Sequence, residues 1–147
     1  MIIVIADTSG LLAALDRAHP EHAGASEALL KAGLLVMSPL LLAEIDHVAT
    51  RELGRKAAMS AVDDIQRWMR VNRIIIPEIT ETHLSEARSV RDRYRDLDLD
   101  LADAVNVALA ADYDTDTVLT LDRRDFRALR PLGRQKSFRL LPDDLPL

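Results

Sequence analysis

Two acidic residues follow apolar runs that are typical of buried strands. Asp7 comes directly after IIVIA at 2–6, and Asp122 follows TVLT at 117–120 after a single leucine. In an open parallel sheet the ligand cleft lies outside the carboxyl ends of the strands. Both carboxylates are therefore expected at such a cleft, where they could bind a cation.

Two more acids interrupt stretches that are otherwise apolar and helical. Glu44 in LLLAEIDHVA lies four residues after Leu40, on the stripe that should face the core. Asp103 and Asn106 are the polar residues of LADAVNVALAA, and Asp100 lies one turn earlier on the same face. An unpaired buried carboxylate is costly, so these side chains should face a cation or a water-filled cleft.

Carboxylates that converge on one cleft repel each other, and two close ones cannot both stay ionised without a counter-charge. Acid oxygens without Cys or His favour Mg²⁺, or Mn²⁺, over zinc or copper, and the chain has no cysteine. One or two such ions can activate water and stabilise the leaving oxygen of a phosphodiester. The candidate catalytic and metal-binding residues are therefore Asp7, Glu44, Asp103 and Asp122.

Each acid also has a simpler explanation. Asp7, with Thr8 and Ser9, could cap the following helix. Glu44 could form a buried ion pair with an arginine. The stretch TLDRRDF at 120–126 could be a solvated turn that neutralises its own charges. The occurrence of all four acids at such positions favours the cleft.

The elements that must position these acids alternate along the chain. Apolar or β-branched runs predict strands at 2–6, 34–37, 73–76, 117–120 and, more weakly, 137–140. Helical patterns are found at 39–53 after a Ser38 cap, at 55–70, at 83–97 after a Thr80 or Thr82 cap, and at 100–113. Strands that alternate with helices predict a three-layer α/β/α sandwich with a central, mainly parallel sheet.

Length and composition limit the possible function classes. A chain of 147 residues is most simply one domain, spanning 1–147. A net charge of −5 and 3% aromatic residues argue against a nucleic-acid coat and against base-stacking platforms. Basic residues are concentrated between 123 and 139. They could form a solvated segment or a rim that contacts phosphate. Without a signal peptide or a membrane-length apolar run, we expect a cytoplasmic protein with no membrane partner.

Four segments together resemble one known family. ADTSG at 6–10, AE at 43–44, YRDLDLDLADAVNVALA at 94–110 and TLDRRDF at 120–126 are similar, in order and spacing, to the PIN-domain ribonucleases. Within these, the chain resembles the VapC-type toxins of bacterial toxin–antitoxin systems. The resemblance implies Mg²⁺-dependent cleavage of structured RNA, such as a tRNA or rRNA loop. It also implies a cognate VapB-type antitoxin that blocks the site, and a toxin homodimer.

The resemblance implies roles for individual residues as well. Asp7, Glu44, Asp103 and Asp122 would be the four acids of the family, with Asp7 and Asp103 as direct metal ligands. Five further polar residues could add to this set or support a ligand; they are Thr8, Ser9, Asp100, Asn106 and Asp125.

Two arginines follow the last of the four acids. We hypothesise that Arg123, Arg124 or both turn outward to RNA phosphate, while Asp125 supports the metal site or caps a short helix that carries Phe126. The final segment, LPDDLPL at 141–147, is interpreted as a loose or antitoxin-contacting tail.

Other families fit the sequence less well. A haloacid-dehalogenase-like phosphatase needs a second Asp two residues after the first, where this chain has Ser9. A phosphoacceptor receiver domain needs a lysine after a late strand, where only Lys136 is available. A di-iron bundle needs two Glu-x-x-His pairs, and the chain has one. The alternative that stays open is a PIN-like module that binds RNA or protein without cutting.

Overall fold

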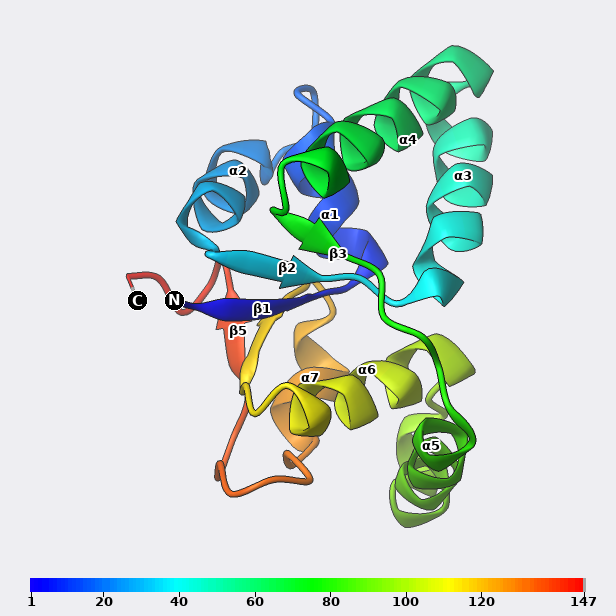
Figure 1. Cartoon of the computed structure of the whole chain (residues 1–147), viewed down its shortest axis with the longest axis vertical. Coiled ribbons are helices and arrows are strands. Elements are labelled where there is room, and N and C mark those ends of the chain that lie inside the picture. The colour runs from blue at the N-terminus through cyan, green and yellow to red at the C-terminus, as the bar shows by residue number, and fades with distance from the viewer. Residues whose placement is uncertain (147) are drawn as a thin grey trace.

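The computed structural model describes residues 1–146, so position 147 of the predicted domain lies outside the described residues. The chain forms an α/β sandwich (Figure 1). The strands are β1 (Ile3–Ala6), β2 (Leu34–Val36), β3 (Ile74–Ile75), β4 (Thr117–Leu119) and β5 (Arg139–Leu141). The helices are α1 (Thr8–Leu15), α2 (His22–Lys31), α3 (Pro39–Leu53), α4 (Arg55–Arg70), α5 (Glu81–Arg93), the 3₁₀ helix η1 (Arg95–Leu97), α6 (Leu101–Asp112) and α7 (Arg123–Ala128).

The strands form one sheet in the order β3-β2-β1-β4-β5, and every pairing is parallel. After β1, the strands β2 and β3 are added on one side of it. The later strands β4 and β5 are added on its other side. The order therefore reverses between β1 and β4, which pair through Ala6 and Leu119. Ligand clefts of parallel sheets lie at the carboxyl ends of strands at such a point.

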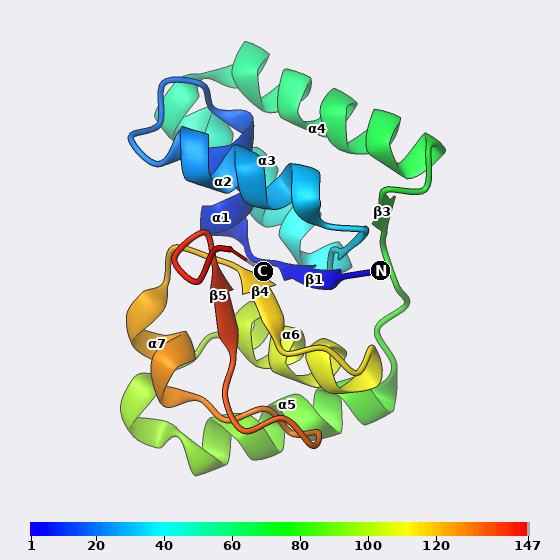
Figure 2. The ribbon, with the colours of Figure 1, turned by 90° about the vertical axis from the view of Figure 1, so that its left-hand side faces the viewer.

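Helices cover both faces of the sheet, as Figures 1 and 2 show. On one face α1 to α4 pack against alternate strand residues such as Val4 and Leu35. On the other face α5, α6 and α7 pack against Ile5 and Val118. Two apolar cores therefore sandwich the sheet, which confirms the predicted three-layer architecture. Among the described helices, none combines the length and the apolar character that a bilayer crossing requires.

The observed elements match most predictions and correct some. Helices were predicted at 39–53 and 55–70 and occur there, and Ser38 accepts the Leu40 N–H as the expected cap. The helix predicted at 83–97 instead begins at Glu81, because Thr80 caps it, and it ends at Arg93 before η1. The weak fifth strand lies at Arg139–Leu141, where its pairing with β4 sets the register. Helix α2 was not predicted, and its N-cap residue makes no side-chain cap bond.

The described part of the C-terminal segment is not a loose tail. Asp143 accepts two hydrogen bonds from Arg123, and Asp144 accepts two from Arg127. Leu145 packs against the core beneath α1 to α4. Two ion pairs and an apolar contact therefore fix residues 141–146 against α7 and the sheet.

Helix α1 lies unusually close to the end of β4. A Cβ atom on Gly10 would lie 2.5 Å from the carbonyl carbon of Leu119, so only glycine allows this approach. Because Leu119 also accepts the Asp7 N–H at 3.0 Å, the contact brings the start of α1 against the carboxyl edge of the sheet.

We expect Gly10→Ala to lower the free energy of unfolding by about 1–3 kcal/mol, because the added methyl group overpacks a rigid backbone contact. Urea unfolding monitored by circular dichroism measures this difference. Gly24→Ala is the control, because its Cβ would meet only the Pro142 side chain, 3.1 Å away. Equal midpoints for wild type and Gly10→Ala would show that the β4 backbone can move aside.

Candidate metal-dependent active site

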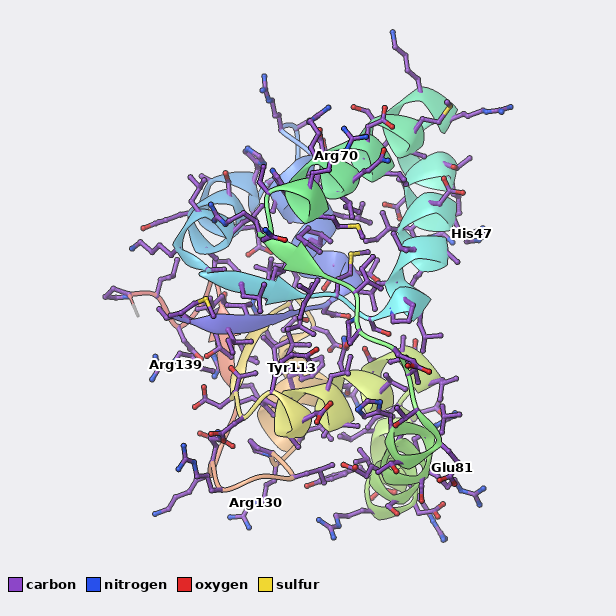
Figure 3. The ribbon with its side chains drawn as sticks, viewed as in Figure 1. His47, Arg70, Glu81, Tyr113, Arg130 and Arg139 are labelled. Atoms are coloured by element: carbon purple, nitrogen blue, oxygen red, sulfur yellow. The ribbon has the colours of Figure 1, made fainter. Side chains whose placement is uncertain are left out.

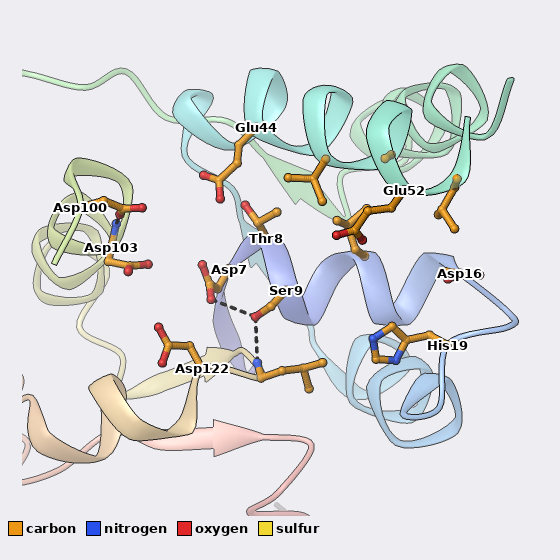
Figure 4. Close-up of a pocket in the computed structure, with 15 residues that line it drawn as sticks. Asp7, Thr8, Ser9, Asp16, His19, Glu44, Glu52, Asp100, Asp103 and Asp122 are labelled. Atoms are coloured by element: carbon orange, nitrogen blue, oxygen red, sulfur yellow. Dashed lines mark hydrogen bonds between the residues drawn. The ribbon is translucent and has the colours of Figure 1, made fainter. Parts of the chain in front are cut away.

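The four predicted acids converge on one cleft at the carboxyl edge of the sheet (Figure 4). The cleft has a volume of about 410 Å³. Asp7 reaches it from the end of β1, Glu44 from α3, Asp103 from α6 and Asp122 from the start of α7. Thr8, Ser9 and Asp100 also line it. The acids come from distant parts of the chain, as expected at a site where the strand order reverses.

Asp7 is the most deeply buried of these acids, with 7% of its surface exposed. Its Oδ2 atom accepts hydrogen bonds from the Thr120 hydroxyl at 2.7 Å and from the Ser9 hydroxyl at 3.1 Å. Burial raises its pKa, and these two hydroxyls oppose the increase. Asp7 is the N-cap residue of α1 but makes no side-chain cap bond, so capping does not explain its position.

Thr120 is a site residue that the sequence pattern does not predict. Its hydroxyl donates to Asp7 and accepts the N–H of Asp122 at 2.9 Å. Ser9 acts in the same way, because it donates to Asp7 and accepts the N–H of Leu121 at 2.9 Å. Two hydroxyls therefore tie the first acid to the segment that carries the last. Thr120 does lie in the TLDRRDF motif, but its partner is 113 residues away, so only the fold shows the contact.

Glu44 faces the cleft rather than the core. The core-facing residues of α3 are Leu41, Ile45 and Ala49, whereas Glu44 is half-buried and exposes its carboxylate beside Thr8. Burial and the negative charge of Asp100 raise the pKa of Glu44, and the Thr8 hydroxyl opposes the increase. Among the described residues no ion pair is found for Glu44, so the arginine-pair explanation does not hold.

The polar residues of α6 have three different roles. Asp100 is the N-cap and accepts the Asp103 N–H at 2.9 Å. Asp103 turns into the cleft, where burial, followed by the charges of Asp7 and other acids, raises its pKa to about 8. Asn106 is buried and donates to the carbonyl of Ala6 at 3.2 Å. It therefore braces the end of β1, next to Asp7.

The tightest group of acidic oxygens in the described residues belongs to Asp103, Asp122 and Asp125, which each offer an atom within 4.8 Å of the others. Asp122 caps α7 by accepting the Asp125 N–H at 3.4 Å. Burial and the charge of Asp122 raise the pKa of Asp125. Hard oxygen donors in this number and spacing fit Mg²⁺ or Mn²⁺. Asp125 therefore lies next to two acids of the cleft, Asp103 and Asp122, whereas the resemblance favoured Asp7 and Asp103 as direct ligands.

The two arginines of the motif differ in their surroundings. The guanidinium of Arg123 is already engaged, because it forms ion pairs with Glu21 and Asp143 while 37% of its side chain is exposed. Arg124 is exposed next to Asp125, and no carboxylate pairs with it in residues 1–146. The hypothesis named Arg123, Arg124 or both as RNA contacts; Arg124 is the unpaired one of the two in residues 1–146, whereas Arg123 joins distant segments.

Comparison with known proteins agrees with this geometry. The model of the PIN domain matches residues 4–130. The chain belongs to the PIN-domain family. Ribonuclease VapC26 of Mycobacterium tuberculosis is 38% identical to this PIN chain over 133 residues, which cover 88% of the chain and 94% of that protein. The protein is therefore a homologue of the VapC ribonucleases, and the resemblance noted in its sequence is confirmed.

Solved structures show the same fold at lower identity. The crystal structure of Mycobacterium tuberculosis VapC20, a sarcin–ricin loop cleaving toxin, matches with a TM-score of 0.70 at 18% identity, over 82% of this chain and 91% of that one. VapBC2 from Rickettsia felis, bound to a DNA fragment from its promoter, matches with a TM-score of 0.65 at 15% identity, over 95% and 99% of the two chains. These likenesses confirm a PIN-like fold.

The raised pKa of Asp103 predicts how stability depends on pH in the PIN protein without metal. Between its ordinary value of 3.8 and about 8, the folded protein keeps a proton that the unfolded chain has released. The free energy of unfolding therefore falls as the pH rises through this window. In EDTA we expect Tm to fall from about pH 5 to about pH 8, and to fall less in Asp103→Asn, which carries no titrating proton.

Differential scanning fluorimetry across this range measures the effect. Asp98→Asn is the matched control, because Asp98 is exposed and does not line the cleft. Added Mg²⁺ should raise Tm more at the upper end of the range, since protons compete with the metal for carboxylates. Parallel pH profiles for wild type and Asp103→Asn would contradict the prediction.

Proposed function

We propose that this VapC homologue is an Mg²⁺-dependent endoribonuclease toxin that cleaves a loop of structured RNA. The observation that carries the proposal is the group of Asp103, Asp122 and Asp125 within 4.8 Å, at the edge of a cleft that Asp103 and Asp122 share with Asp7 and Glu44. Carboxylates this close need a counter-charge, because burial and mutual repulsion already raise the pKa of Asp103 to about 8.

The chain supplies the ligands and their support. Asp103, Asp122 and Asp125 would hold the cation, with Asp7 as a further ligand that Thr120 and Ser9 orient. The bound cation would supply a Lewis acid that polarises the phosphodiester and acidifies a water molecule. Glu44, on the opposite wall, is placed to accept a proton at its carboxylate, because its raised pKa brings it closer to neutrality.

The relatives suggest the substrate class and the partner. VapC26 is a ribonuclease and VapC20 cleaves the sarcin–ricin loop, which supports a tRNA or rRNA loop as the substrate here. A toxin–antitoxin complex from Klebsiella pneumoniae shares the fold with a TM-score of 0.58 at 19% identity, over 89% of this chain and 99% of that one. We therefore propose a cognate VapB-type antitoxin that neutralises the enzyme, and a toxin homodimer stays a prediction.

Purified protein freed of antitoxin should cut total cellular RNA at discrete sites with Mg²⁺ or Mn²⁺, and EDTA should abolish the cuts. Asp103→Asn should lower the cleavage rate by roughly a hundredfold or more, because it removes a charged ligand from the cleft. Asp98→Asn should cleave like wild type. Quantitative end mapping of the products measures both variants.

If folded wild type and Asp103→Asn left RNA equally intact in the presence of metal, the carboxylates would have no catalytic role. The non-catalytic alternative, a PIN-like module that binds RNA or protein, would then be favoured.

A second prediction separates the two arginines. Arg124→Ala should weaken RNA binding and reduce the slope of log K against log[salt] by about one unit, with Tm unchanged, because one phosphate contact is lost. Arg123→Ala should lower the free energy of unfolding by about 1 kcal/mol, because two ion pairs are lost. Fluorescence anisotropy over a salt series and thermal melts measure these effects. A salt slope that is unchanged in Arg124→Ala would exclude it from the RNA contact.

A further inference from the structure

The cleft extends well beyond the metal site. Its second part, here called the distal half, is lined by Leu12, Asp16, His19, Val48 and Glu52. Figure 4 shows the four acids around the N-terminal end of α1, and Asp16, His19 and Glu52 around its C-terminal end. The eight residues of α1 span roughly 12 Å, so the two halves are separated by about that distance.

His19 presents a hydrogen-bond donor in the distal half. Its Nδ1 atom accepts the backbone N–H of Glu21 at 3.0 Å. In a neutral imidazole with Nδ1 as acceptor, the proton is on Nε2, which leaves an N–H group available to a ligand. His19 is also the only cleft-lining residue, within the described chain, with an aromatic ring.

The turn that carries His19 is held in place from two sides. The Asp16 side chain accepts the N–H of Ala18, and its carbonyl accepts the N–H of His19, both at 3.0 Å. At the other end, Glu21 forms an ion pair with Arg123 of α7. Arg123 therefore anchors the wall of the distal half through Glu21, and the hydrogen bond from the Glu21 N–H holds the imidazole ring.

The chemistry of the distal half favours a neutral, flat ligand with both donors and acceptors. Asp16 and Glu52 would repel a phosphate group but accept hydrogen bonds from an amino group. The Nε2–H group of His19 would oppose a cation but donate to a ring nitrogen or carbonyl. Leu12 and Val48 supply an apolar wall. The edge of a nucleobase combines these requirements, and unpaired bases are read in this way in RNA loops.

We propose that the distal half binds an unpaired base that carries an exocyclic amino group, on a nucleotide neighbouring the scissile phosphate. His19 donates to the base from Nε2, and Asp16 or Glu52 accepts from its amino group. The inference rests on the proposed ribonuclease function, since it assigns a specificity site to the same cleft. It predicts that adenine, guanine or cytosine is preferred over uracil at one fixed position beside the cut.

Two variants of His19 separate the contribution of its flat ring from that of its hydrogen-bond donor. His19→Phe keeps a flat ring and loses the donor, so cleavage at the preferred sites should fall about tenfold and the preference against uracil should relax. His19→Gln can accept the Glu21 N–H and still donate, so it should retain most of the preference. His47→Phe is the control, because His47 is exposed and points outward from α3 (Figure 3).

Cleavage of total RNA with Mn²⁺, followed by sequencing of the new ends, reads rate and base preference together, and thermal melts verify folding. Unchanged rate and preference in His19→Phe would overturn the inference while leaving the ribonuclease function intact. If His19→Phe kept the rate and base preference of wild type but was neutralised less well by the antitoxin, the distal half would be a binding site for the antitoxin instead of a base. No metal-dependent cutting by wild type would instead contradict the ribonuclease function.

A binding measurement tests the distal half without cleavage. Cytidine 5′-monophosphate should shift the NMR signals of the His19 ring more than uridine 5′-monophosphate does, in wild type and in Asp103→Asn alike. Equal or absent shifts for the two nucleotides would overturn the inference.

Discussion

The carboxylates of the cleft repel one another, and the contacts around them must offset this repulsion for the chain to fold. Asp7 would be an unfavourable residue at the end of a buried strand without the hydroxyls of Thr120 and Ser9, which hydrogen-bond to its Oδ2 atom. Asp103 has no such hydroxyl, and its pKa rises to about 8. Such a cluster opposes folding at neutral pH and gains stability when a cation binds. A cation that binds this cleft would therefore also stabilise the fold.

The parallel sheet makes this concentration of charge possible. Because the strand order reverses between β1 and β4, the segments after these strands diverge and leave a cleft between them. Asp7 and Asp122 follow these two strands, and α3 and α6 bring Glu44 and Asp103 from opposite faces. Asn106 braces the carbonyl of Ala6, and the close contact at Gly10 fixes α1 against β4. Glu44 and Asp103 thus lie within helices, and Asp7 and Asp122 lie at the N-caps of α1 and α7.

The basic segment shows why charge along a sequence is a poor guide to a binding surface. Arg123, Arg127 and Arg134 lie close to Arg124 in the sequence, yet each pairs with a carboxylate far along the chain or across a turn. Arg123 links α7 to Glu21 and to Asp143, so it connects the acidic end of the cleft with the turn of His19. Its role is in the architecture of the cleft, while Arg124 remains exposed.

Local periodicity in the sequence is enough to predict the layers and most helices, and carboxylates in apolar surroundings are enough to predict that four acids share one cleft. The sequence did not determine α2 or the register of β5, where local signals are weak and packing decides. It also could not show that Thr120 holds Asp7, that Arg123 reaches Glu21, or that His19 lies in the cleft. Those contacts join residues with no local relation, so only the tertiary structure brings them together.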